Sequence, residues 1–268
     1  MAHQVNRWKF KQLEDVKIIL NEEGKKADLT GSTLLESSPS PGAAGLIALT
    51  HLIDFLQPTK IGEVKSPHFP QISIVNDSGL ANQPKIELYF YDKDVKLLLM
   101  LRNFPIESSE GSYIIAKKLY EFFKSKGVKA YYLLASSRIY GESNVYVAST
   151  SINNAKSLIE AGAKLSPNLD ALPLDRFGAY MLSFFARNYD LAFILISEVY
   201  SYLPDPAAAK RLLEVLSKAL RFKIDMEKLD REIEKQKRLI EEFQRGFGQI
   251  LPEREEQPSR EREPYYIG

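Results

Sequence analysis

Residues 86–101 read IELYFYDKDVKLLLML and carry the pattern that decides the fold. The two apolar runs in this stretch, 86–91 and 95–101, are rich in aromatic and leucine residues and have the length of β-strands. Only Asp92, Lys93 and Asp94 separate them, so we expect a tight antiparallel hairpin. The unbroken apolar character of 95–101 favours a central strand that is covered on both faces.

Similar runs recur along the chain and alternate with helical patterns. The remaining strand candidates are 16–20, 33–35, 130–135, 145–149 and 191–196, and the helical candidates are 46–56, 110–126, 152–161 and 177–188. In 110–126 the residues Tyr113, Ala116, Leu119 and Phe123 fall on one face, and Gly127 can end the helix. The alternation predicts an α/β fold over residues 1–222, with a layered, mostly parallel or mixed sheet flanked by helices.

A helical extension follows this domain. Asp205 can cap a helix over 207–222, because Pro206 suits the first helical position. A second helix within 223–251 has seven positions spaced three and four residues apart, which are Met226, Leu229, Ile233, Gln236, Ile240, Phe243 and Phe247. About three heptads of this spacing are typical of a coiled coil, and we expect these residues to support oligomerisation. The alternative is an amphipathic helix that lies on its own domain.

The last segment, 252–268, is charged and rich in proline. Between Pro252 and Pro264 it contains no apolar residue other than proline, so we expect a disordered tail. The tail ends in Tyr265, Tyr266, Ile267 and Gly268. Tyrosines combine apolar area with a hydroxyl group and suit an anchor in a pocket of a partner protein. Alternatively, these four residues fold back onto the body of the protein.

Composition excludes several classes of function. Lys and Arg total 36 against 35 for Asp and Glu, so no global field recruits nucleic acid or an anionic membrane. The chain has no cysteine, which excludes disulfides and thiol catalysis. The first twenty residues lack the apolar core of a signal peptide, and no apolar run reaches transmembrane length. We therefore expect a soluble cytoplasmic protein with no nucleic-acid or membrane partner.

Candidate chemistry is sparse. The turn at 41–45 (PGAAG) precedes a helix and could hold a phosphate together with Arg138, although Gly42 and Gly45 equally suit a tight turn and close packing. The histidines His3, His51 and His68 are scattered, and Ser136 and Ser137 lie in no nucleophile elbow. The loop and strand-end carboxylates are Asp77, Asp92, Asp94, Asp175 and Glu198. No catalytic group, cofactor or metal site is predicted from these residues.

Three segments together resemble the PAC2 family of proteasome assembly chaperones, including its archaeal homologues. They are the glycine turn and helix at 41–56, the stretch IGEVKSPHFP at 61–70, and YLPDPAAA at 202–209 with the helix that follows. The second segment is the most specific of the three. The chain departs from the family at the first turn, where Ser38, Pro39, Ser40 and Pro41 replace a pattern with an aspartate after the proline.

This resemblance implies a phosphorylase/hydrolase-like α/β domain without enzyme activity that forms homo-oligomers and binds proteasome α subunits independently of ATP. Some proteins of this kind end in a hydrophobic residue, a tyrosine and any residue, which enter pockets between α subunits. Tyr265, Tyr266 and Ile267 are similar to that ending, but Gly268 moves the carboxylate outward. The alternatives are a nucleoside phosphorylase-like or hydrolase-like enzyme and a cap or adaptor of the 20S proteasome.

Overall fold

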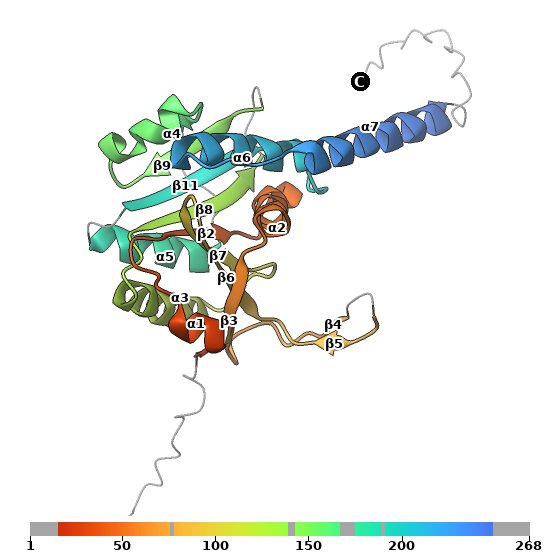
Figure 1. Cartoon of the computed structure of the whole chain (residues 1–268). Helices are drawn as coiled ribbons and strands as arrows, with labels where there is room; N and C mark the ends of the chain where they lie inside the picture. The colour runs from red at the N-terminus through yellow and green to blue at the C-terminus, as the bar shows by residue number, and fades with distance from the viewer. Residues whose placement is uncertain (1–15, 76–77, 139–142, 167–174, 189–190, 249–268) are drawn as a thin grey trace, which may run out of the picture.

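A mixed nine-stranded sheet forms the centre of the molecule (Figure 1). The computed structural model describes residues 16–75, 78–138, 143–166, 175–188 and 191–248. The strand order is β1-β3-β6-β7-β2-β8-β11-β9-β10. The strands are β1 (Lys17–Leu20), β2 (Thr33–Ser37), β3 (Thr59–Lys65), β6 (Ile86–Asp92), β7 (Lys96–Leu101), β8 (Ala130–Ser137), β9 (Val145–Ser149), β10 (Lys164–Leu165) and β11 (Leu191–Glu198).

The middle four strands are parallel, and antiparallel strands extend the sheet on both sides. β2 pairs in parallel with β7 and β8, and β8 pairs in parallel with β11. β6 and β7 form the antiparallel hairpin expected from residues 86–101, with Asp92 opposite Lys96. The predicted α/β class and mixed sheet are therefore confirmed.

Helices cover both faces of the sheet because side chains alternate along the central strands. Leu34, Leu98 and Leu133 pack against α3 (Ser109–Ser125) and α5 (Arg176–Arg187). The neighbouring residues Leu35 and Leu134 point to the other face. There they join α2 (Ala44–Leu56), α4 (Lys156–Glu160) and α6 (Pro206–Leu220). The short helix α1 (Glu22–Lys26) contacts β3. As predicted, Asp205 caps α6 by accepting from the Ala208 amide at 2.8 Å.

The glycine turn before α2 brings that helix close to the sheet. Gly42 has a φ of +73°, in the region that favours glycine. A Cβ on Gly45 would lie 2.2 Å from the carbonyl oxygen of Leu134, so only glycine fits at this crossing of α2 over β8. This geometry supports the interpretation of the turn as a packing element.

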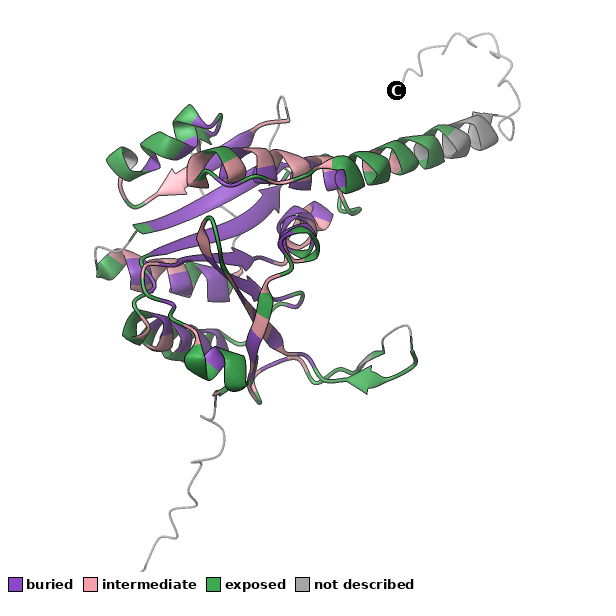
Figure 2. Cartoon of the chain, in the orientation of Figure 1, coloured by how far each residue is buried: buried purple, intermediate pink, exposed green. Residues whose placement is uncertain are grey.

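Two elements project from the body (Figures 1 and 2). The first is an arm made of β4 (Ile74–Val75) and β5 (Ala81–Asn82), which pair only with each other among the described strands. The second is α7 (Glu227–Gly248), the helix expected within 223–251, which extends away from the sheet and whose described side chains between 234 and 241 are mostly exposed. None of the helices described here is long and apolar enough to cross a membrane.

Candidate functional site

The carboxyl ends of the four parallel strands gather polar side chains at one edge of the sheet. Glu36 is the second-last residue of β2, Arg102 directly follows β7, and Ser136 and Ser137 end β8. In α/β folds this edge is the usual place for a ligand site. These residues therefore form the candidate site.

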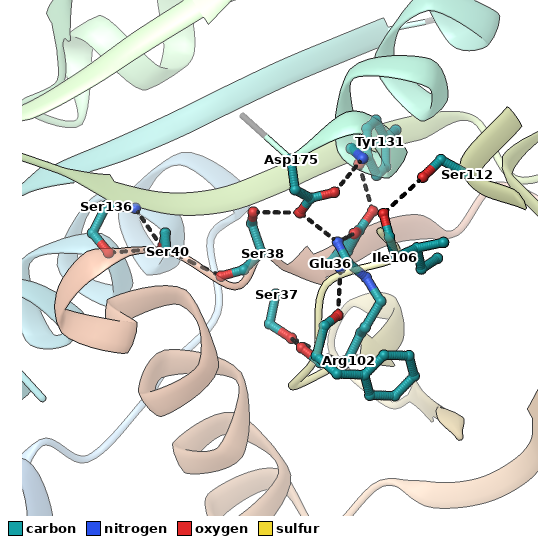
Figure 3. Close-up of polar contacts among 12 residues, drawn as sticks. Glu36, Ser37, Ser38, Ser40, Arg102, Ile106, Ser112, Tyr131, Ser136 and Asp175 are labelled. Atoms are coloured by element: carbon teal, nitrogen blue, oxygen red, sulfur yellow. Dashed lines mark hydrogen bonds and ion pairs between the residues drawn. The ribbon is translucent and has the colours of Figure 1, made fainter. Parts of the chain in front are cut away.

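Arg102 is the centre of a buried network (Figure 3). One of its terminal nitrogens donates to Glu36 Oε1 at 2.8 Å and to Asp175 Oδ2 at 2.7 Å. The other donates to the carbonyl of Phe104 at 2.8 Å. Its guanidinium group also lies 4.7 Å from the ring centre of Phe177. The Arg102 and Glu36 side chains have no exposed surface, whereas the Asp175 side chain is 12% exposed, so this network holds one carboxylate in the core and a second at its margin.

Asp175 connects the network to α5 and to the loop after β2. Its Oδ1 accepts from the amide of Gly178 at 2.9 Å and so caps the helix. Ser38 donates to its Oδ2 at 2.9 Å. On the other side, the Tyr131 hydroxyl donates to Glu36 Oε2 at 2.5 Å. The network thus joins the start of α5 and the loop after β2 to β8 and to the residues that follow β7.

Burial and charge change the pKa values of these groups in opposite directions. Burial raises the pKa of Glu36 to about 7, despite the favourable charge of Arg102. For Asp175, burial favours a higher pKa, but the charge and hydrogen bonds of Arg102 have the larger effect. The pKa of Asp175 therefore lies below its ordinary value. The pKa of Tyr131 rises well above its ordinary range through burial and the nearby Glu36. Glu36 has the pKa of an acid–base group, but its side chain is closed to solvent.

A second polar cluster lies beside the glycine turn. Ser40 Oγ and Ser136 Oγ are 2.8 Å apart, and Ser136 Oγ accepts weakly from the Ala44 amide at 3.4 Å. The start of α2 is thus in contact with a side chain of β8. Arg138 is exposed and its guanidinium group lies 5.4 Å from the ring centre of Tyr202. The turn and Arg138 each have a partner within the chain.

The two described histidines, His51 and His68, have different neighbours. His51 is buried in α2 and its Nε2 donates to the carbonyl of Asp225 at 2.7 Å, which joins α2 to the start of α7. His68 is half-buried against Gly111 of α3, and His3 lies outside the described residues. Within the described part of the chain, no group of three or more metal-binding side chains occurs.

The predicted oligomerisation residues divide into an inner and an outer group. Met226 and Leu229 pack against the domain's own core, and Leu229 is buried there. Ile233 is half-buried, and Gln236 donates to the carbonyl of Pro204 at 2.7 Å. Ile240, Phe243 and Phe247 lie on α7, but their side chains fall outside the described structure, as do Tyr265, Tyr266, Ile267 and Gly268. Oligomerisation and partner binding by these residues stay predictions.

Sequence reasoning missed Glu36, Arg102 and Tyr131. Only Asp175 of the network was among the carboxylates considered. The available signal was a charged residue within or directly after an apolar strand, as in TLLES and in the arginine that follows VKLLLML. Such a residue needs a buried partner, although the sequence does not identify it.

Comparisons with known proteins place these features in a family. A model of the PAC2 family matches residues 34–244. The uncharacterized protein MJ1210 of Methanocaldococcus jannaschii is 27% identical over 256 residues, which cover 94% of this chain and 98% of that protein.

Solved structures share the fold at low identity. Pyrococcus furiosus PbaB, described as an archaeal proteasome activator, has a TM-score of 0.78 at 21% identity and covers 86% of this chain and 99% of its own. Pyrococcus furiosus PbaA, described as an archaeal homolog of proteasome-assembly chaperone, has a TM-score of 0.73 at 21% identity, with 88% and 94% covered. The Mycobacterium tuberculosis proteasome-assembly chaperone homologue Rv2125 has a TM-score of 0.61 at 18% identity, with 78% and 94% covered. Because the family model extends from β2 into α7, the chain belongs to the PAC2 family.

Proposed function

We propose that this protein is a non-enzymatic proteasome assembly chaperone-like protein that binds proteasome α subunits. It acts without ATP, as a homo-oligomer in the cytoplasm, and it uses its C-terminal tail for part of the contact. Membership of the PAC2 family supports this proposal, as does the fold shared with homologues of proteasome-assembly chaperones.

The geometry of α7 is the observation that carries the proposal. Its inner half is fixed to the body through Leu229 and through the hydrogen bond from His51 to Asp225. Its outer half leads the chain away from the sheet (Figure 1). This anchoring supports a role for the residues beyond Gly248 in contacting another molecule.

The sequence of the tail fits a pocket contact. Tyr265 and Tyr266 offer aromatic anchors, and Ile267 adds an apolar side chain beside them. Buried tyrosine is a frequent hot-spot residue in protein interfaces. Several tails on one oligomer would multiply the affinity through effective concentration.

The state of the buried network favours a non-enzymatic role. The position at the carboxyl ends of the strands, where an α/β enzyme binds its substrate, holds Glu36 and Asp175, each paired with Arg102. A substrate would need to displace a fully buried ion pair to reach Glu36. The network is therefore better suited to bracing this edge than to acid–base chemistry.

A second candidate is an activator or cap that binds the mature 20S particle. It is favoured by the similarity to PbaB, which has a higher TM-score than PbaA. Both candidates use the same partner and the same tail, and they differ in whether the protein binds free α subunits or the assembled particle.

Native mass spectrometry tests the proposal. The intact protein is mixed with free α subunits, and separately with 20S proteasome, beside a matched protein that ends at Pro264. We expect binding only with the intact tail, and the preferred partner distinguishes chaperone from activator. Equal binding by both proteins would refute the role of the tail, and binding by neither would refute the proposed partner. Thermal-shift measurements with phosphate, nucleosides and nucleotides test the enzyme alternative, which predicts stabilisation at millimolar ligand.

A further inference from the structure

The loop between β11 and α6 exposes large apolar side chains beside α7. Tyr200, Tyr202 and Leu203 are 68%, 73% and 66% exposed. Three such neighbours on one loop form a surface of the kind that proteins use for binding one another. We call Tyr200, Tyr202 and Leu203 the aromatic loop.

The aromatic loop is held in place on three sides. Gln236 of α7 donates to the carbonyl of Pro204 at 2.7 Å, directly after the loop. The Asp205 amide donates to the carbonyl of Gly42 at 2.8 Å. Arg138 lies over the ring of Tyr202. The loop therefore presents a shaped surface, so that binding would require little ordering.

The aromatic loop lies next to the heptad residues of α7. Gln236 belongs to the heptad series of the helix, so the loop lies on the heptad side of α7. One turn further, Leu239 flanks the same side and is 55% exposed. The outer half of α7, residues 238–248, is about 16 Å long at 1.5 Å per residue. The described part of this face comprises the aromatic loop, Gln236 and Leu239, and in the sequence the heptad series continues with Ile240, Phe243 and Phe247.

We infer that a second copy of this chain docks on this face, with its α7 parallel to the first and the two aromatic loops in contact at the base. In the heptad register of Ile233 and Gln236, Glu232 and Lys237 occupy the two flanking positions. A parallel copy brings Glu232 of each helix beside Lys237 of the other, which is the pairing that sets orientation in coiled coils. A parallel arrangement also releases both tails at the same end.

This inference rests on the proposed function only for the existence of a homo-oligomer, because it names the surface through which the oligomer forms. The β4–β5 arm supplies the matched control. Its Leu80 is 63% exposed, nearly the same as Leu203, but lies on a different part of the molecule. Substituting Leu203 and Leu80 in turn therefore distinguishes an interface at the aromatic loop from an interface at the β4–β5 arm.

The first experiment measures the mass of the full chain by light scattering and native mass spectrometry, for the wild type, Leu203→Ser and Leu80→Ser. We expect the wild type and Leu80→Ser to form the same oligomer, and Leu203→Ser to dissociate with unchanged circular dichroism. A monomeric wild type, an intact Leu203→Ser oligomer, or dissociation of Leu80→Ser would each overturn the inference. Because no proteasome is present, failure here is distinct from failure of the proposed partner.

A charge exchange tests the orientation of the helices. Glu232→Lys places like charges together in a parallel oligomer, and we expect the dissociation constant to rise about tenfold. Adding Lys237→Glu to the same chain restores opposite charges and should restore the wild-type constant. Lys237 also pairs with Glu234 on its own helix at 3.2 Å, but both side chains are exposed and that pair is weak. A double variant as weak as the single one would refute the parallel pairing.

The absence of cysteine from the sequence permits a direct proximity test. Leu203→Cys should form a disulfide between two copies under mild oxidation, whereas Leu80→Cys should not. The reverse result, or no disulfide at Leu203→Cys in an oligomer that forms, would refute contact between the aromatic loops.

Discussion

At the scale of single residues, Arg102 holds together the buried polar network at the carboxyl ends of the strands. Its guanidinium group satisfies Glu36 and Asp175 at once, and each carboxylate is fixed by a further donor, Tyr131 or Ser38. A buried ion pair adds little stability compared with an apolar core, but the loss of one partner leaves an uncompensated charge. The network therefore fixes the positions of these side chains at the edge of the sheet, and the substitution of any one of its charged members should destabilise the protein.

Arg102→Met should destabilise the protein by about 3–5 kcal/mol, because it leaves two buried carboxylates without their cation. The free energy of unfolding is measured in urea at pH 7. Arg231→Met serves as the control, since the Arg231 side chain is 73% exposed and its loss should cost less than about 0.5 kcal/mol. Equal effects of the two substitutions would contradict the role given to Arg102.

Glu36 makes stability depend on pH in a predictable direction. Its pKa rises from an ordinary 4.5 to about 7 in the folded state, which therefore binds the proton more tightly than the unfolded state. This contribution to stability is complete below about pH 4.5 and is lost as the pH rises through 7. The lowered pKa of Asp175 acts oppositely, and its contribution is lost only as the pH falls below the ordinary value of 3.8.

Glu36→Gln removes the titration of Glu36 and isolates it from that of Asp175. We expect the stability of the wild type relative to Glu36→Gln to fall between pH 5 and pH 8, by as much as about 3 kcal/mol. Urea unfolding of both proteins across this range provides the measurement. A difference that stays constant or increases with pH would show that burial does not raise the pKa of Glu36.

At the scale of elements, the close crossing of α2 over β8 depends on Gly45. Gly45→Ala would place a Cβ within 2.2 Å of the backbone oxygen of Leu134, which cannot rotate away. The expected loss of stability is about 1–3 kcal/mol, as for other overpacked cores. Thr50→Ala on the exposed side of the same helix is the control and should change the melting temperature little. If Gly45→Ala leaves the melting temperature unchanged, the packing interpretation of the glycine turn is wrong.

Elements with one dominant local signal could be predicted from the sequence. The hairpin of β6 and β7 follows from two apolar runs and a short turn, and α6 follows from Asp205 and Pro206. β3 was missed because Lys60, Glu63 and Lys65 interrupt its apolar pattern. These residues pair with Glu87 and Lys85 or with each other beside the sheet. Residues 152–161 divide into a short 3-10 helix and α4, a detail that periodicity does not resolve.

The candidate site was harder to predict because its residues meet only through the topology of the sheet. Glu36 and Arg102 are 66 positions apart, and Asp175 is a further 73 positions along the chain. The order of β7, β2 and β8 brings these segments together. No spacing in the sequence encodes that order, so the sequence could indicate a buried charge but not its partners.

At the scale of the whole molecule, α7 connects the domain to the residues that follow Gly248. The body fixes the inner half of the helix through Leu229, and the outer half extends beyond the domain. Association of copies along this outer half would leave the sheet and its buried edge unchanged. Oligomer formation and tail binding should therefore be separable by substitution.

The contribution of several tails on one oligomer can be measured by separating oligomer formation from tail binding. Leu203→Ser, if monomeric, retains the sequence of Tyr265 to Gly268 but presents one tail instead of several. Under the proposed function, tails on one oligomer would bind neighbouring pockets at high effective concentration, so the monomeric variant should bind immobilised 20S proteasome about 100-fold more weakly. The protein that ends at Pro264 should lose tail-dependent binding while it remains oligomeric. Biolayer interferometry at low proteasome density compares both with the wild type and with Leu80→Ser, which should retain full affinity. Equal affinity of wild type and monomer would mean that a single tail accounts for the contact, since linked tails must bind more tightly than one whenever two pockets are within their reach.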